Sequence, residues 1–380
     1  MNVKRLGSEW KNISTIVVYG MGAVADRFLD KILQDFQVPY IIDYKKQGKK
    51  YHDIPVISYE MLRENIRQEK YKIVVMTSQR VYSEIKRILE ADNFVEMEDF
   101  CRIELFAIEW YRANRNMMNI LQVNTAVTTW CTLNCEKCNM FMPYYGERKH
   151  YTLTEMKEDI DILLKYVDYI FLYSFLGGEP FLNKDLKNII SYIGDTYSDR
   201  IGKLGITTNG TVVPDDETLY QIKKYQVTVN ISDYTAVVPY QEKLDRLIDV
   251  LKKWEIAYIR NHMTEWKDFG FPNKPFHWGK EGGHDHMKSC SPLFHGINDK
   301  KFYYCHVIWS ADKAGIYTAP ESDYIDLTEL EPDNEADKKK VWRYALGDCE
   351  RGFLGFCMVC GGCGEDNDKA VVAGIQSKKM

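Results

Sequence analysis

The sequence predicts an α/β protein: a small doubly wound N-terminal domain at residues 1–114, a partial (β/α)6 barrel at 120–280 and a cysteine-rich domain at 281–380. Two observations predict this fold class. Short β-branched runs alternate with segments of helical periodicity, first up to about residue 90 and again after the polar linker RANRNMMN. Such alternation is typical of βαβ units on parallel sheets. Beyond residue 281 the periodicity is lost, and six of the ten cysteines occur there.

The first domain is predicted from strands and helices that follow each other in turn. For example, STIVVY is a short β-branched run, and the segment after the next glycines has apolar residues at helical spacing. We expect strands at Ser14–Tyr19, Val38–Ile42, Pro55–Ile57 and Lys72–Thr77, and helices at Ala23–Leu33, Tyr59–Gln68 and Tyr82–Glu90.

A glycine loop follows the first of these strands. Gly20 and Gly22 open the next helix, and Asp43 ends the second strand. In this context glycines let a pyrophosphate approach a helix N-terminus, and the acidic residue accepts hydrogen bonds from a ribose. The domain resembles Rossmann-like modules of polysaccharide-biosynthesis proteins, in which YGxG precedes a helix and an IPV segment follows. Nucleotide binding and a purely structural or docking role both stay open.

The barrel is predicted from five further strands. In parallel barrels the functional side chains lie at the carboxyl ends of the strands. The strands are expected at Val123–Thr129, Tyr169–Tyr173, Lys203–Thr207, Val227–Ile231 and Ala257–Arg260, and the helices at Leu153–Tyr166, Lys184–Ile193, Glu217–Lys224 and Tyr240–Lys253.

Composition narrows the function classes. The net charge of −5 disfavours a basic nucleic-acid surface, and no run approaches the ~20 apolar residues of a membrane span. Without a signal peptide, the chain is expected to be cytoplasmic, with neither nucleic acid nor membrane as partner. Because disulfides are rare in a reducing cytosol, its two cysteine groups predict two metal sites. Cys101 and Cys349 are interpreted as a core residue and a bystander.

The strongest motif is Cys131-Thr-Leu-Asn-Cys135-Glu-Lys-Cys138, directly after the first barrel strand. Three thiolates on a short loop can bind three irons of a cubane cluster and leave the fourth iron open. Catalytic metal sites keep such an open position, whereas structural sites are closed. A zinc site that takes a ligand from elsewhere is the alternative.

This CxxxCxxC spacing resembles the radical S-adenosylmethionine (SAM) superfamily, and two further segments match it in order. GGEP ends the second barrel strand and TTNGT the third, while Lys137 replaces the aromatic residue that usually precedes the third cysteine. The resemblance implies that the cluster reduces SAM to a 5′-deoxyadenosyl radical, with an electron from a donor such as flavodoxin or ferredoxin. It implies SAM contacts by Gly177, Gly178, Glu179, Pro180, Thr208, Asn209 and Ser232; Arg260 is a further candidate partner of the SAM carboxylate.

The C-terminal cysteines resemble the auxiliary-cluster domain of SPASM/twitch radical enzymes. The resemblance implies a second 4Fe–4S cluster on Cys290, Cys305, Cys360 and Cys363, with Cys357 able to replace one of them. A zinc ribbon is the alternative. Since residues 281–380 show little apolar periodicity, we expect them to bury little apolar surface and to depend on metal for order.

The segments CTLNCEKCNMFMPYY, GGEPFLNKDL and CGGC…IQ resemble radical proteins of polysaccharide and aminoglycoside pathways. The resemblance implies oxidation or epimerisation of a sugar-like or nucleotide-linked small molecule, with the auxiliary cluster as electron acceptor. A peptide-modifying SPASM/twitch enzyme and a non-enzymatic, zinc-binding nucleotide sensor are the alternatives. The sequence identifies no general base.

Overall fold

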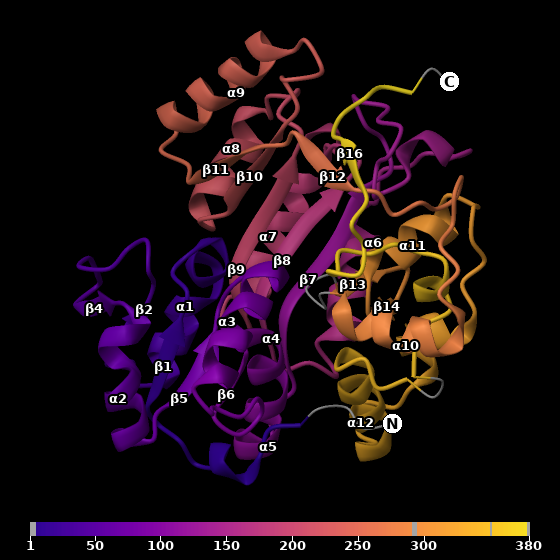
Figure 1. Ribbon diagram of the computed structural model, residues 1–380. Helices are drawn as coiled ribbons and strands as arrows, with labels where there is room; N and C mark the ends of the chain where they lie inside the picture. The colour runs from indigo at the N-terminus through magenta and orange to yellow at the C-terminus, as the bar shows by residue number, and fades with distance from the viewer. Residues whose placement is uncertain (1–4, 291–294, 350–351, 378–380) are drawn as a thin grey trace. The chain divides into compact units, whose positions relative to one another are not determined.

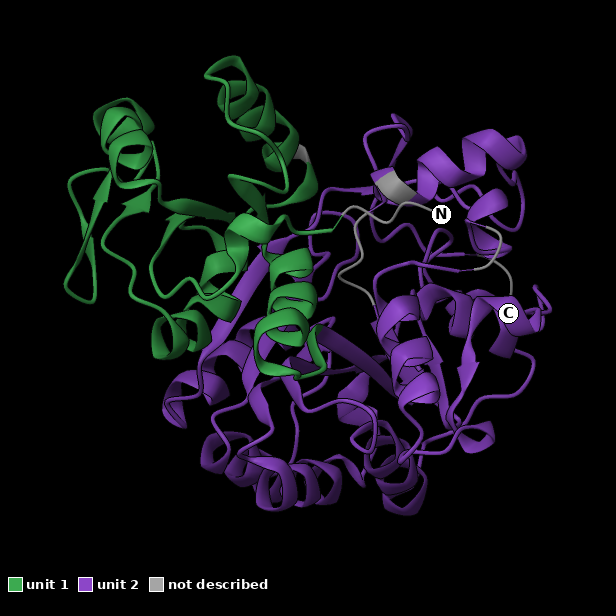
Figure 2. Ribbon diagram, turned by 90° about the horizontal axis from the view of Figure 1, so that it is seen from below, with its two compact units in different colours: residues 1–121 green, residues 122–380 purple. Residues whose placement is uncertain are grey.

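The computed structural model describes residues 5–290, 295–349 and 352–377, apart from the side chains of Arg80 and Lys288 (Figure 1). The chain divides into two compact units, residues 1–121 and 122–380, which Figure 2 colours separately. The predicted further division of the second unit near residue 281 stays a prediction.

Unit 1 holds a six-stranded sheet of order β3-β4-β2-β1-β5-β6, in which only β3 pairs antiparallel. Successive side chains of a strand point to opposite faces. In β1, Val17 lies in the core cluster with α2 and α3, while Ile16 and Val18 are equally buried. Both faces of the sheet are therefore covered, as in doubly wound proteins.

The predicted strands and helices of unit 1 are all present, with ends that differ by a few residues. Cys101 is fully buried in β6, which confirms its interpretation as a core residue. The elements are β1 Ile16–Tyr19, α1 Ala23–Asp35, β2 Ile41–Ile42, β3 Lys50–Tyr51, β4 Ile54–Ile57, α2 Tyr59–Glu69, β5 Lys72–Val75, α3 Gln79–Ala91, β6 Phe100–Arg102, α4 Ile103–Leu105 and α5 Tyr111–Arg115.

Unit 2 is built on an eight-stranded sheet of order β11-β10-β9-β8-β7-β13-β14-β15. Strands β8, β9, β10 and β11 pair in parallel, each with the next, and β13 is parallel to β7. The five predicted barrel strands are present as β7 Asn119–Thr128, β8 Tyr169–Gly177, β9 Ile201–Thr208, β10 Thr228–Asp233 and β11 Tyr258–His262. The predicted helices between them are α6 Leu153–Leu163, α7 Leu186–Tyr197, α8 Asp216–Lys224 and α9 Gln241–Lys253.

The expectation that residues 281–380 bury little apolar surface is wrong. Ile297, Phe302, Trp309 and Leu354 are at most 1% exposed, and β13 continues the sheet directly beside β7. The strands here are too short for a period-2 pattern to be recognised in the sequence. The elements are β12 Glu265–Lys267, α10 Gly279–Ser289, β13 His295–Asn298, β14 Lys301–Tyr303, α11 His306–Lys313, β15 Ile325–Asp326, α12 Glu335–Ala345 and β16 Ala370–Val372.

Buried polar side chains join this region to the sheet. The carboxamide of Asn298 donates to the carbonyl of Ala126 at 3.0 Å and accepts from its N–H at 2.8 Å, which continues the β7–β13 pairing by side-chain contacts. On α6, Asp159 Oδ1 accepts the N–H of Lys300 at 2.6 Å. Asp159 is 2% exposed, and among the described residues its Oδ2 has no hydrogen-bond partner.

Burial raises the pKa of Asp159 to about 7, and this makes a pH-dependent contribution to stability. Since the folded-state pKa exceeds the usual value, this contribution is present at low pH and is lost as pH rises through about 7. We expect Asp159→Asn in metal-free protein to keep the contact with Lys300 without the buried charge. Relative to wild type, its unfolding free energy should rise between pH 4 and 8 by up to about 4 kcal/mol, measured by urea denaturation. The exposed Asp245→Asn on α9 is the control, and parallel pH profiles for all three proteins would contradict the assignment.

Candidate active site

The site begins where two backbones touch without intervening side chains. A Cβ on Gly177 would lie 2.1 Å from the Thr128 carbonyl oxygen, and one on Gly178 would lie 2.0 Å from that of Trp130. The Gly178 N–H donates to Thr128 at 2.9 Å, and the Glu179 N–H donates to Trp130 at 2.7 Å. Only glycine permits this approach, which holds the start of the cysteine loop against the end of β8.

Glu179 joins the loop after β8 to the loop after β9. Its carboxylate is fully buried and accepts the Thr208 hydroxyl at 2.7 Å, the Asn209 N–H at 2.8 Å and the Phe181 N–H at 3.2 Å. Burial raises its pKa to about 7, although these three donors oppose the shift. Glu179 thus positions Thr208 and Asn209; neither it nor the buried Pro180 lines the cavity described next.

The three thiols of the motif line one cavity of about 180 Å³. Each sulfur accepts N–H groups: Cys131 from Leu133 at 3.4 Å and Asn209 at 3.5 Å, Cys135 from Gln376 at 3.2 Å, and Cys138 from the backbone that follows it. Burial raises the pKa of Cys131 to about 12 and that of Cys135 to about 11, and the neighbouring thiolates add to both shifts. Convergent thiols with N–H donors at the sulfurs fit a 4Fe–4S cluster.

Residues from the ends of three strands line a further part of this cavity, beside apolar side chains such as Leu133 and Met142. Sequence-predicted residues on the wall are Gly177, Gly178, Thr208, Asn209 and Ser232, at the ends of β8, β9 and β10. Sequence reasoning missed Tyr234 and Trp266, whose rings lie 5.4 Å apart at 79°. Tyr234 lies three residues after the predicted fourth strand, so its position near a strand end could have indicated it. Nothing in the sequence indicated Trp266.

Two predicted cations have protein partners. Arg260 contacts the buried Asp233 at 2.9 Å and does not line the cavity. Lys137 Nζ lies 3.1 Å from Asp268 Oδ1, so the side chain that replaces the usual aromatic residue forms an ion pair within the protein.

The five sequence-predicted auxiliary cysteines line a second cavity of about 220 Å³. Burial raises the pKa of Cys305 to about 12 and that of Cys360 and Cys357 further, and Cys290 adds to all three shifts because its thiolate is close. Cys349 is not on this wall, as expected of a bystander. The set is Cys290, Cys305, Cys357, Cys360 and Cys363.

The two cavities share part of their walls, since Asn139, Met140 and Leu176 line both. Among the described residues, no three His, Cys, Asp or Glu side chains converge closely enough to hold one metal ion. A 4Fe–4S cluster has a different requirement, because it binds each thiolate through a separate iron.

In unit 1 the glycine loop and Asp43 do come together. Gly20 has φ +108°, and a Cβ there would lie 2.8 Å from the Met76 carbonyl oxygen, so this glycine is needed for chain packing. The Asp43 carboxylate accepts the N–H groups of Met21 at 2.9 Å, Lys45 at 2.9 Å and Lys46 at 3.0 Å. Both carboxylate oxygens of Asp43 therefore already accept hydrogen bonds from the protein's own backbone.

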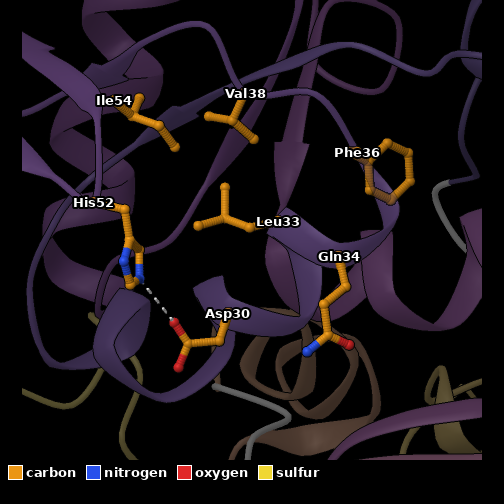
Figure 3. Close-up of a pocket in the computed structure, with 7 residues that line it drawn as sticks. All are labelled: Asp30, Leu33, Gln34, Phe36, Val38, His52 and Ile54. Carbon is orange, nitrogen blue, oxygen red and sulfur yellow. Dashed lines mark ion pairs between the residues drawn. The ribbon is translucent and has the colours of Figure 1, made fainter.

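A surface pocket of about 550 Å³ lies elsewhere in unit 1 (Figure 3). The predicted nucleotide-binding residues Gly20, Gly22 and Asp43 do not line it. The side chains drawn in Figure 3 are mostly apolar, with His52 Nε2 lying 3.8 Å from Asp30 Oδ1 at one side. Its lining residues are Asp30, Leu33, Gln34, Phe36, Val38, His52 and Ile54.

The parallel α/β sheet and the thiol triad at its strand ends fit the class of proteins that hold an iron–sulfur cluster at the mouth of a partial barrel. Comparison with family models agrees with this reading: residues 125–259 match the family described as Radical SAM superfamily. Residues 12–97 match the family described as C2185-like, N-terminal.

A probable GTP 3′,8-cyclase of Methanococcus aeolicus is 33% identical over 94 residues, which are 25% of this chain and 31% of that protein. The match thus spans less than a third of the relative's length. The structure of Streptococcus suis SuiB bound to S-adenosylmethionine has TM-score 0.30 at 19% identity, covering 40% of this chain and 34% of SuiB. BtrN in complex with AdoMet and 2-DOIA has TM-score 0.39 at 16% identity, covering 64% of this chain and 93% of BtrN.

No helix in the described part of the chain is both long and apolar enough to cross a bilayer.

The backbone contact at Gly178 gives a direct test of how the cysteine loop is positioned. In Gly178→Ala the new Cβ would meet the backbone of Trp130 and Cys131, which cannot rotate away. We expect a loss of stability of at least about 2 kcal/mol and the loss of iron from the triad, measured by denaturation and by iron per chain. Gly146→Ala is the matched control, because a Cβ there meets no atom within 4 Å. Equal iron content in the two variants would contradict this account.

Proposed function

We propose that this protein binds a catalytic 4Fe–4S cluster at Cys131, Cys135 and Cys138 and uses it to cleave SAM and oxidise an alcohol carbon of a small-molecule substrate. The observation that supports it is the convergence of three N–H-bonded thiols on a cavity that the ends of β8, β9 and β10 also line. When bound and reduced, such a cluster supplies the electron for reductive SAM cleavage, and the resulting 5′-deoxyadenosyl radical removes a substrate hydrogen atom.

The chain's own part is to orient SAM and to exclude water. The backbone of Gly177 and Gly178 and the side chains of Thr208, Asn209 and Ser232 offer polar contacts at the cavity wall. Glu179 and Pro180 would act indirectly, by holding these loops. Arg260 would have to leave Asp233 to reach a carboxylate. The rings of Tyr234 and Trp266 give the wall apolar surface that keeps water from a radical.

We propose a second 4Fe–4S cluster in the second cavity, on Cys290, Cys305, Cys360 and Cys363, with Cys357 as the substitute ligand. The shared wall at Asn139, Met140 and Leu176 supports electron exchange between this cavity and the first. An auxiliary cluster held there would supply an acceptor for the electron that remains after the substrate alcohol has lost its carbinol hydrogen atom and its hydroxyl proton, so that the product would be a carbonyl compound.

We propose that the substrate is a sugar-like or nucleotide-linked small molecule, which the enzyme oxidises or epimerises. We also propose that unit 1 is a Rossmann-like module. The glycine loop of unit 1 supports it, although Asp43 is occupied by backbone N–H groups. Flavodoxin or ferredoxin is the proposed electron donor, as small soluble carriers of low potential.

Iron counting tests the two-cluster proposal. After anaerobic reconstitution we expect about eight irons per wild-type chain and about four after Cys131, Cys135 and Cys138 are all replaced by Ala, because cysteine thiolates hold each cluster. The variant should form no 5′-deoxyadenosine from SAM and dithionite. Four irons in the wild-type protein and none in the variant would contradict the proposal of an auxiliary cluster. No iron in either protein would contradict the proposed radical chemistry.

Isotope transfer tests the dehydrogenation. Candidate sugars, nucleotide sugars and peptides are incubated with reconstituted full-length protein, SAM and a reductant, and the substrate is the one that accelerates 5′-deoxyadenosine formation. With deuterium at the carbinol carbon of that substrate, we expect deuterium in 5′-deoxyadenosine and a carbonyl product. Acceleration by peptides alone would favour the peptide-modifying alternative.

A further inference from the structure

The last described residues return from the second cavity to the catalytic cysteine loop. Beyond Cys363, β16 pairs antiparallel with β12, from Glu265↔Val372 to Lys267↔Ala370, and Figure 1 shows the two strands side by side. The Asp268 N–H donates to Lys369, and the Ala373 N–H donates to Thr264, at 3.0 Å each. We name residues 369–377 the C-terminal strap.

The end of the strap pairs with the cysteine loop through its backbone. The Glu136 N–H donates to the Ile375 carbonyl at 2.8 Å, and the Ser377 N–H donates to the Asn134 carbonyl at 2.6 Å. Cys135 and Gln376 face each other in an antiparallel bridge. The loop between the first and third cysteines thus gains a strand partner from the far end of the sequence.

The side chain of Gln376 contacts the cysteine sulfur itself. Its Nε2 donates to Cys135 Sγ at 3.2 Å and to the Gly374 carbonyl at 2.7 Å, while its Oε1 accepts the Asn134 N–H at 2.7 Å. The oxygen must face the Asn134 donor and the nitrogen must face the Gly374 acceptor, so these two contacts fix the amide orientation. An N–H group, and not the carbonyl, therefore points at the sulfur.

The strap is also held against the cavity wall. Gly374 has φ +83°, and a Cβ there would lie 3.0 Å from the Cβ of Tyr234, which lines the catalytic cavity with Trp266. Ala373, the residue before it, is fully buried. Gln376 is therefore presented from an anchored segment, which limits the positions its amide can take.

We infer that Gln376 is a positioning residue for the catalytic cluster, whose amide donates a hydrogen bond to the ligand Cys135 and makes the reduction potential of that cluster less negative. An N–H donor at a ligand sulfur stabilises the reduced cluster more than the oxidised one, because reduction adds negative charge there. Easier reduction speeds the delivery of an electron to SAM. The inference rests on the proposed function, since it requires a cluster on Cys135.

The test compares Gln376→Met, which removes the donor in a similar shape, with Gln376→Glu, which also adds charge. In the reconstituted full-length protein we expect a more negative midpoint potential in both variants, larger in Gln376→Glu, and slower 5′-deoxyadenosine formation. The potential is measured by redox titration of the electron paramagnetic resonance signal that changes on addition of SAM. Ile375→Ala is the matched control, because this strap residue exposes its side chain and offers the loop only its backbone.

The outcomes separate the two proposals. A shift in both Gln376 variants, with Ile375→Ala at the wild-type potential, supports the inference. A shift in Gln376→Glu alone would reduce the effect to added charge and overturn it. So would a wild-type potential in Gln376→Met, whether its iron content is full or lowered, since a purely structural clamp changes occupancy and not potential. Wild-type protein without iron would instead defeat the proposed function.

Discussion

The site depends on the contact between the backbone of Gly177–Gly178 and that of Thr128–Cys131. A side chain at either glycine would push the cysteine loop away by more than its neighbours could accommodate. From this contact the remaining geometry follows: Glu179 is placed where its buried carboxylate can accept from Thr208 and Asn209. The ends of β8 and β9 are thereby held together around the thiols.

Much of this arrangement could be predicted, because it is encoded locally. The alternation of strand and helix signals gave the parallel strands of both units, and strand-end position correctly grouped Thr208, Asn209 and Ser232 with the cysteines on one cavity wall. The contact of Glu179 with the cofactor stays a prediction. What the sequence did not indicate is that its fully buried carboxylate accepts hydrogen bonds from three protein donors in the loops after β8 and β9.

What could not be predicted depends on contacts between distant parts of the sequence. Strand β13 has four residues and no visible alternation, yet Asn298 secures it to β7 by a side chain that imitates backbone pairing. Asp43 stands where a ribose ligand is expected, but three local N–H groups take its oxygens. Secondary-structure propensity and motif spacing predict neither of these two arrangements. Each depends on which hydrogen-bonding groups surround the polar side chain after folding.

The N–H donors at the sulfurs of Cys131, Cys135 and Cys138 come from separate sources. Cys138 receives them from its own loop, Cys131 from its loop and the end of β9, and Cys135 from the C-terminal strap. A thiolate in a buried site needs such donors, because burial alone favours the neutral thiol. The surroundings of the triad therefore draw on the C-terminal strap as well as on the motif's own loop. The described residues before the strap pack on the same sheet as the motif, since β13 pairs with β7.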